Sequence, residues 1–282
     1  MTLLLDPRQR AMLAEMGVRT NFLPTSPSDV PAAVAPPKVA PAKVQRSENR
    51  PHPATPQAPG IASAQPRASL AANAVSEMDW EALAQSVRDC QACGLCKTRK
   101  NTVFGVGAPA AGPGLAPRAD WLIVGEAPGE NEDLQGEPFV GQAGRLLDNM
   151  LKAMGLSRRA QGTPEASVYI LNVLKCRPPG NRNPQPEELL QCAPFLERQV
   201  ALLQPKIIVA MGRFAVQSLL KDTVPQVESM PLGKLRGQIY SYRGIPVVVT
   251  YHPAYLLRSL AEKAKAWADL CLALSRARRP QD

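Results

Sequence analysis

Residues 121 to 147 read WLIVGEAPGENEDLQGEPFVGQAGRLL, an apolar run followed by two glycine-rich turns and the start of a helical pattern. Short apolar runs rich in β-branched and aromatic residues are typical of buried strands. Continuous apolar strands that alternate with helices indicate a parallel sheet covered on both faces. Strands are predicted at residues 121–124, 168–173, 206–211 and 246–251, and helices at 78–89, 143–154, 186–203, 213–220 and 262–278.

These elements predict an α/β fold, a three-layer α/β/α sandwich with a central four-stranded, mainly parallel sheet. The chain before it has a different composition, because residues 21–75 hold 11 of the 29 prolines and a single aromatic residue. So few bulky apolar groups cannot offset the entropy of ordering, and we predict a disordered linker there. Residues 1–20 predict a short helix that either binds a protein partner or is a terminal helix without a role. One folded domain is predicted over residues 76–282.

The formal net charge of +9 and the pI of about 9.4 favour a polyanionic partner such as nucleic acid. The sequence has no run of 18 apolar residues, and its apolar opening is too short for a signal peptide. We therefore expect a cytoplasmic, monomeric protein with no membrane partner. In that compartment six cysteines are not expected to form structural disulfides, so clustered ones indicate a metal site.

The cysteines follow such a clustered pattern. Cys90, Cys93 and Cys96 have C-x2-C-x2-C spacing, and Cys176 and Cys192 follow on a predicted loop and helix. All-sulfur ligation suits a [4Fe-4S] cluster or zinc. Spacing alone leaves the choice of ligands open. The sixth cysteine, at position 271, is more simply a small buried apolar side chain.

Polar clusters follow three of the predicted strands: GEAPGENED after Val124, Asn172 with KCRPP, and His252 with Pro253. The carboxyl ends of parallel strands meet at one edge of a sheet, where α/β proteins place their sites. We therefore expect the three clusters to converge. The sequence contains no G-x-x-x-x-G-K-S/T pattern, which excludes a P-loop.

The segments GEAPGENED, GEPFVGQAGRLL, NVLKCRPPGNRNP and HPAYLLR, together with Cys192, occur in an order and at separations that resemble the family 4 uracil-DNA glycosylases. The resemblance covers roughly residues 85 to 275. It implies an enzyme that flips uracil out of DNA and hydrolyses its N-glycosidic bond, the first step of base excision repair. It also implies a [4Fe-4S] cluster held by Cys90, Cys93, Cys176 and Cys192. Cys96 is a departure, because that position is not a ligand in the family.

The resemblance also implies roles for side chains. His252 is expected to donate to uracil O2, where negative charge develops as the base leaves. Asn172 is expected to accept from uracil N3–H and to donate to O4. Phe139 is expected to stack on the extruded base. The plain alternatives are a capped histidine, a turn-capping asparagine and a core phenylalanine.

The resemblance also bears on three residues of the first motif. Ala127 occupies the position at which a related glycosylase family has a water-positioning aspartate, so catalysis here is expected to depend on stabilising the leaving group. Glu126 is expected either to align water or to brace the turn. Glu132 resembles the family's barrier near uracil C5, which excludes the methyl group of thymine, and the alternative is a solvated surface carboxylate.

The segment after His252 resembles the loop that enters DNA. Tyr255 and Leu256 are expected to fill the gap left by the flipped nucleotide and Arg258 to meet phosphate, although Leu256 could equally be a core residue. Individually, basic residues are more simply solvated charges. Further candidates for phosphate contacts are Lys175, Arg177, Arg182, Lys234 and Arg236.

Two other functions compete with catalysis. A uracil-DNA-binding relative would crosslink to the abasic sugar through a histidine on an additional basic loop, but RPPGNRNPQPEELLQ, between Cys176 and Cys192, contains no histidine. A non-catalytic iron-sulfur or zinc module that binds nucleic acid is the second alternative, and a tethered N-terminal segment would suit such an adaptor.

Overall fold

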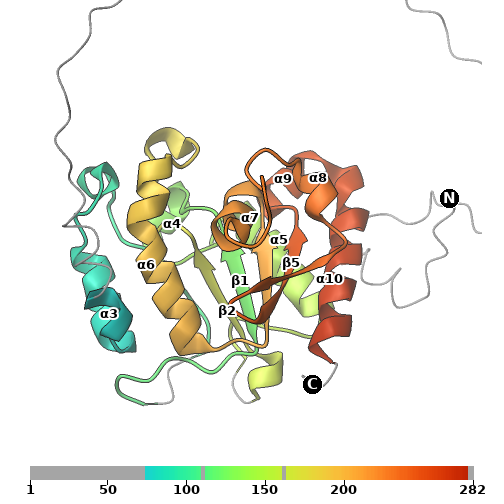
Figure 1. Ribbon diagram of the computed structural model, residues 1–282, viewed down its shortest axis with the longest axis horizontal. Coiled ribbons are helices and arrows are strands. Elements are labelled where there is room, and N and C mark those ends of the chain that lie inside the picture. Colours follow the sequence, from blue (N-terminus) through green and yellow to red (C-terminus); the bar gives the residue numbers. More distant parts are fainter. Residues whose placement is uncertain (1–73, 109–111, 161–162, 279–282) are drawn as a thin grey trace, which may run out of the picture.

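The structure is a computed structural model that describes residues 74–108, 112–160 and 163–278 (Figure 1). The predictions for residues 1–20 and for most of the linker therefore lie outside the described residues. The last residues of the predicted linker belong to the folded domain, because residues 74–77 form a helical turn and Val75 packs against Leu83, Val87 and Phe195. Within the described ranges no helix is long and apolar enough to cross a membrane.

The α/β fold class is confirmed, with five strands in the order β2-β1-β3-β5-β4. All four predicted strands are present and pair in parallel. The additional strand, β4, pairs with β5 in the antiparallel direction at the edge of the sheet. The strand has only four residues, of which Tyr242 alone is buried, and they form no continuous apolar run. For that reason the sequence analysis did not predict it. The strands are β1 Trp121–Gly125, β2 Val168–Asn172, β3 Ile207–Met211, β4 Ile239–Tyr242 and β5 Ile245–Thr250.

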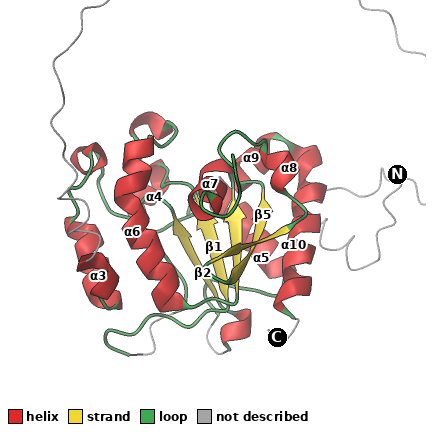
Figure 2. Ribbon diagram, in the orientation of Figure 1, coloured by secondary structure: helices red, strands yellow, loops and turns green. Residues whose placement is uncertain are grey.

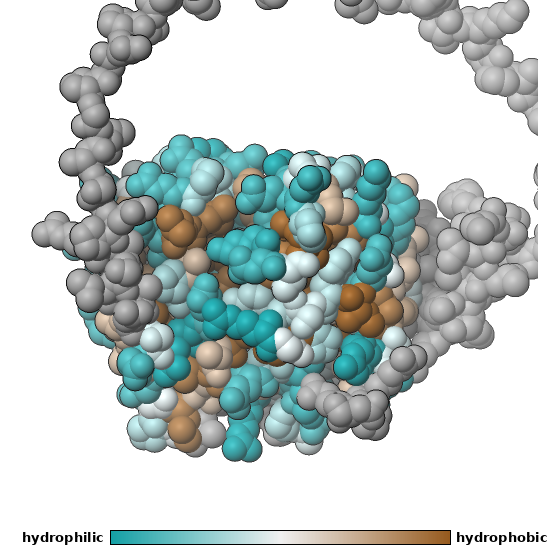
Figure 3. Space-filling view, viewed as in Figure 1, coloured by the Kyte–Doolittle hydropathy of each residue, from teal (hydrophilic) through white to brown (hydrophobic). Residues whose placement is uncertain are grey.

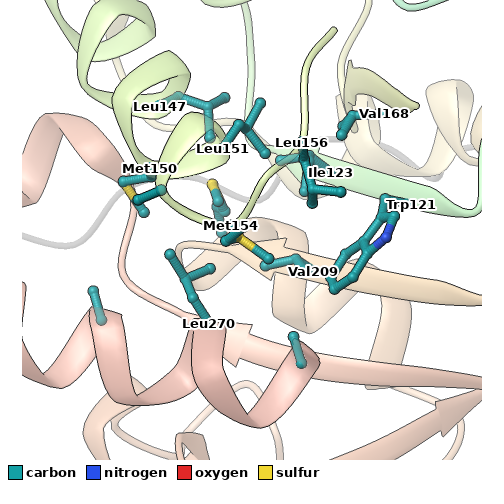
Figure 4. Packing of buried hydrophobic residues seen from close by; sticks show 14 of the residues in the cluster. Trp121, Ile123, Leu147, Met150, Leu151, Met154, Leu156, Val168, Val209 and Leu270 are labelled. Atoms are coloured by element: carbon teal, nitrogen blue, oxygen red, sulfur yellow. The ribbon is translucent and has the colours of Figure 1, made fainter. Parts of the chain in front are cut away.

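Helices cover both faces of this sheet (Figures 1 and 2). Trp121 and Ile123 of β1 point into the core under α5, α9 and α10, and Figure 4 shows part of that packing. Leu122 and Val124 point the other way, into the core under α6 and α7. The bounds of the helices are α3 Trp80–Asp89, α4 Glu130–Gln135, α5 Gln142–Ala153, α6 Pro186–Leu203, α7 Arg213–Leu220, α8 Leu232–Leu235, α9 Pro253–Arg258 and α10 Lys263–Ala277, with short 3-10 turns η2 Gly94–Lys97, η3 Pro164–Ala166, η4 Pro179–Asn181 and η5 Leu260–Glu262.

The arrangement puts the amino ends of three helices at one edge of the sheet. The helices α4, α7 and α9 each follow the carboxyl end of a parallel strand, namely β1, β3 and β5. Helix α3 lies outside this sandwich and packs on α6 (Figure 1). On the face of the domain that Figure 3 shows, hydrophobic residues form small separate patches among hydrophilic ones.

Helix α9 corrects one expectation from the sequence. Leu256, expected to enter DNA, has no exposed surface and belongs to the core under α5 and α10. Leu257 is 39% exposed, and Tyr255 is 38% exposed. Successive residues of a helix point about 100° apart, and in α9 this step carries the side chain of Leu257 out of the core that Leu256 enters. The apolar surface of this segment is therefore formed by Tyr255 and Leu257.

The two leucines should differ sharply in stability. Replacing Leu256 with Ala leaves a cavity in the core, which costs about 2–5 kcal/mol of unfolding free energy. Replacing Leu257 with Ala removes a partly exposed side chain and should cost about 0.5 kcal/mol or less. Thermal unfolding of the two variants beside the unchanged chain measures the difference. Equal losses in both would contradict the packing of α9.

Candidate active site

A cavity of about 770 Å³ opens at the carboxyl edge of the sheet. Phe139, Asn172 and His252, which come from three separate segments, all line it. The predicted convergence of the three polar clusters is therefore found. The first motif contributes further residues to the wall, namely Glu126, Ala127, Pro128, Gly129 and Glu132.

Gly125 makes room for two side chains of the cavity wall, Asn172 and Phe139. It is the last residue of β1 and pairs with Asn172 at the end of β2. A methyl group at Gly125 would overlap Asn172 Oδ1 and would lie 2.7 Å from Phe139 Cζ. Both side chains therefore occupy the space that any other residue at this position would fill. Asn172 and Phe139 are 2% and 5% exposed, so neither can move aside without rearranging the core.

Phe139 is held in an unusual backbone conformation. Its φ of 56° lies in the left-handed region, which is strained for a bulky residue and marks functional sites when the surrounding structure enforces it. The carbonyl of Phe139 also lies so close to Gly144 that a side chain there would overlap it. The phenyl ring stacks on the imidazole of His252 with centroids 5.3 Å apart and planes inclined by 28°. Strain and packing together orient an aromatic ring beside the cavity.

His252 lies between β5 and α9, where its side chain has a defined hydrogen-bonding role. Its Nδ1 accepts a hydrogen bond from Ala254 N–H at 3.2 Å, so the proton of the neutral ring is on Nε2. Burial lowers the pKa of His252 to about 4, and the charge of Arg258 lowers it further while Glu132 opposes the shift. Close to neutral pH the imidazole is thus uncharged and presents one N–H donor.

Glu132 lines the cavity and is not a free surface carboxylate. One carboxylate oxygen accepts from Gly129 N–H at 3.1 Å, which closes the capping box of α4. The other accepts from Val140 N–H at 3.0 Å and from Gly141 N–H at 3.2 Å. A single side chain therefore ties together the two glycine-rich turns that form one wall of the cavity.

Glu126 lines the cavity with a half-buried side chain. Burial raises the pKa of its carboxyl group, and the positive charge of Arg213 opposes that shift. Arg213 is itself a cavity residue that the sequence analysis missed. Arg213 lies just after the carboxyl end of β3, as the three motifs lie just after the ends of their strands. This position in the sequence could have identified it.

Four of the expected basic contacts are exposed or half-buried. Arg258 is exposed on α9 at the rim of the cavity, and Lys234 is exposed on α8. Arg182 lines the cavity while it forms an ion pair with Glu188. Arg177 is 3.5 Å from Glu130 and donates to Asn181, so part of its bonding capacity is used within the chain.

Arg236 does not fit the expectation of a phosphate contact. Its Nε is 2.7 Å from a carboxylate oxygen of Asp269, a residue that is 1% exposed. Its guanidinium also lies 4.5 Å above the ring of Tyr251, the residue before His252. The prediction was wrong because the guanidinium of Arg236 forms an internal ion pair and does not face solvent.

Lys175 is a second correction. It is 1% exposed and heads the fully buried side chains by size, so it cannot reach a phosphate on DNA. Burial lowers its pKa to about 7, while nearby Cys192 and Cys176 oppose the shift. Its ammonium donates to the main-chain carbonyl of Asn172.

Five cysteines line one small cavity between α3, η2 and α6, and all of them are free thiols. Burial raises the pKa of Cys192 to about 12 and also raises that of Cys176. Arg99 donates to Cys176 Sγ at 3.1 Å, which is the bond expected for a thiolate ligand. The five are Cys90, Cys93, Cys96, Cys176 and Cys192, whereas Cys271 packs against the core on the other face of the sheet.

This donor set fits an all-sulfur metal centre, because buried thiols ionise when a cation compensates their charge. The position of Cys96 in the same cavity leaves the choice among the first three cysteines as open as their spacing did. Over the described ranges, no three histidine, cysteine or carboxylate side chains are grouped tightly enough for a single metal ion.

Comparison with known proteins agrees with this site. Residues 113–271 match the family model described as the uracil DNA glycosylase superfamily. The type-4 uracil-DNA glycosylase of Saccharolobus solfataricus is 43% identical over 180 residues, which are 62% of this chain and 76% of that protein. That of Archaeoglobus fulgidus is 41% identical over 62% of this chain and 81% of its own, and that of Pyrobaculum aerophilum 39% identical over 69% and 93%. The match to the family model and the similarity to these relatives show that the chain belongs to the uracil-DNA glycosylase superfamily and, within it, to the type-4 enzymes.

Proposed function

We propose that this protein flips uracil out of DNA and hydrolyses the bond between the base and deoxyribose, leaving an abasic site. The observation that carries the proposal is the convergence of an aromatic ring, a carboxamide and an uncharged imidazole in one cavity. Reaching a base inside such a cavity requires that the nucleotide leave the stack. The family of the chain supports the same reaction.

The proposed base recognition uses Asn172 and Phe139. The carboxamide of Asn172 can accept from uracil N3–H and donate to O4, whereas cytosine presents an amino group where uracil has O4. Both side chains pack in the space left by the missing side chain of Gly125, and this packing fixes their positions. Fixed polar groups discriminate well, because the wrong base leaves them buried and unpaired.

His252 is proposed to stabilise the leaving base. As the glycosidic bond breaks, the uracil ring gains negative charge and the sugar gains positive charge. The Nε2–H of His252 is the free donor of the ring, since Nδ1 is occupied by Ala254 N–H. A neutral donor suits this role because it stabilises O2 without placing a full positive charge beside the developing sugar cation.

Glu126 is proposed to align the attacking water. Its carboxylate lies in the cavity wall, while bracing of the turns is performed by Glu132. Burial raises the pKa of Glu126, and the charge of Arg213 opposes that shift and favours the carboxylate, which is the form that accepts a proton from water. Of the two alternatives for Glu126 we propose water alignment, because Glu132 already braces the turns.

Tyr255 and Leu257 are proposed to occupy the gap in the DNA stack. Both are exposed on α9, directly after His252, and Tyr255 lines the cavity. An apolar wedge offsets part of the stacking energy lost when a base is flipped. Arg258, Arg213 and Lys234 are the exposed cations placed to contact the flanking phosphates.

A [4Fe-4S] cluster is proposed at the cysteine cavity, with Cys90, Cys93, Cys176 and Cys192 as ligands. Such a cluster would supply structural crosslinking there, since glycosidic hydrolysis transfers no electrons. It would join the segment after α3 to the loop after β2 and to α6. It would thereby restrain the loop that follows Asn172. Arg99 would donate to one of its thiolates.

Removing the donor or the base reader should slow the reaction without unfolding the protein. His252→Ala should lower the single-turnover rate of uracil release by roughly 10²–10³-fold, the usual cost of losing one transition-state donor. Asn172→Ala should lower the rate on uracil as well. Lys206→Ala, at the opposite edge of the sheet, is the matched control and should leave the rate unchanged. Substrates with U·G, U·A and single-stranded uracil are compared.

Unchanged rates in both site variants would instead favour a non-catalytic module that binds nucleic acid. The same incubations distinguish the third function, because a crosslinking relative would yield a stable protein-DNA adduct on denaturing gels instead of free uracil and an alkali-labile site.

The pH dependence of His252 follows from its lowered pKa. Its imidazole should titrate near pH 4, and rates should show no inflection near its ordinary pKa of 6.5. Because the folded state resists protonation, the free energy of unfolding should fall as pH drops from about 6.5 to about 4. The chain has two histidines, so His52→Gln leaves a single imidazole for NMR titration. A midpoint near 6.5 for His252 would contradict the buried, neutral donor.

The cysteine assignment predicts which variants lose the metal centre. Cys176→Ser and Cys192→Ser should abolish the brown colour and the iron content of anaerobically purified protein, because buried ligands cannot be replaced from solvent. Cys271→Ser is the control and should keep both, as should Cys96→Ser. Loss of iron in Cys96→Ser with retention in Cys93→Ser would reassign the ligands, and zinc in place of iron would replace the cluster by a structural zinc site.

A further inference from the structure

Lys175 is the buried charge that the proposed reaction leaves unexplained. Lysines are almost never fully buried unless their charge is compensated. At 1% exposure this one lies between the cysteine cavity, which it lines, and the catalytic cavity, which Asn172 lines. Its placement connects the two sites physically.

Its contacts run in both directions. The ammonium donates to the main-chain oxygen of Asn172 at 2.5 Å, so the side chain folds back over its own loop. In the other direction, Lys175 lines the cavity of the five cysteines and is followed in the chain by Cys176. One residue therefore lies beside the proposed cluster ligands and bonds to the proposed base reader.

The bond from Lys175 to Asn172 lies at the end of strand β2. Asn172 is the last residue of β2, and the two residues after it are tied by their N–H groups to Gly125 and Glu126. The carbonyl of Asn172 lies in the same buried turn, where an unpaired acceptor is costly. Lys175 satisfies that acceptor, which fixes the peptide plane from which the carboxamide of Asn172 extends.

We propose that Lys175 is a positioning residue for Asn172 that links it to the cysteine site, so that an ordered cysteine site fixes the geometry of base recognition. The inference rests on the proposed function and on the proposed cluster. Lys175 precedes Cys176 in the chain and lines the same cavity, so ligands held at that site would also hold the segment from which the ammonium reaches Asn172. When that segment is displaced, the carbonyl of Asn172 loses its donor.

The test replaces Lys175 with Met, which fills a similar volume but cannot donate. Lys263→Met, at the other buried lysine, on α10, is the matched control. Rates of uracil release are expressed per cluster-bearing chain from measured iron, so that cluster loss is not counted as a catalytic effect. We expect kcat of K175M to fall roughly 10- to 100-fold, as for other residues that orient a ligand or catalytic group, with KM for DNA unchanged because Lys175 is buried away from DNA.

A double-mutant cycle separates positioning from general damage. If Lys175 acts through Asn172, then Lys175→Met should have no further effect on the rate of the Asn172→Ala variant, although it slows the unchanged enzyme. An independent structural role would instead give additive losses in the double variant. The visible spectrum of each variant gives a second readout, and we expect K175M to retain the iron-sulfur absorbance but to lose it faster to a chelator.

The inference is overturned if K175M releases uracil at the unchanged rate per cluster, or if its loss is additive with that of Asn172→Ala. Lys175→Gln, whose amide is too short to reach Asn172, is judged by the same criteria if K175M does not fold. Failure of the unchanged protein to release uracil would overturn the proposed function instead, and that result is read from the same assay before any variant is compared.

Discussion

The parallel pairing of β1 with β2 determines the geometry of this protein. It places Gly125 opposite Asn172 at the carboxyl ends of the strands, and the missing side chain at Gly125 leaves the space that Asn172 and Phe139 occupy together. The stack of Phe139 on His252 then brings in the end of β5, two strands away. A larger residue at Gly125 would separate these groups, so the catalytic cavity depends on one backbone position.

Around that position, charged side chains that are buried or half-buried hold loops in place. Glu132 accepts three main-chain N–H groups and joins the two turns of the first motif. Arg236 pairs with Asp269 and stacks on Tyr251 next to His252, and Lys175 bonds the turn after β2. Loops that follow strands have few ladder partners of their own, and satisfied buried polar groups give them a single conformation. Fixed geometry is what electrostatic stabilisation of a leaving group requires.

The proposed cluster extends the same principle to a larger scale. Its ligands come from the segment after α3, the loop after β2 and α6, three parts of the chain that meet in a small apolar cluster around the cysteines. Metal-thiolate bonds would crosslink these segments in addition to that packing. Because Lys175 lies between this centre and Asn172, stability of the cysteine site and accuracy of base recognition are coupled in the proposed scheme.

The sequence by itself determined the α/β class, four strands, five long helices and the convergence of three motifs, because periodicity and strand-end position are local properties of the chain. It did not reveal β4, whose alternating edge residues carry no continuous apolar run. Nor could it assign the charged and apolar side chains that follow the motifs. Leu256 and Leu257 are the same residue type, and they differ in the direction in which the side chain points. In the same way, the charges of Lys175 and Arg236 meet partners inside the protein, whereas that of Arg258 is exposed. Those partners are distant in the sequence, so only the packed tertiary structure decided which residues are exposed and which hold the site together.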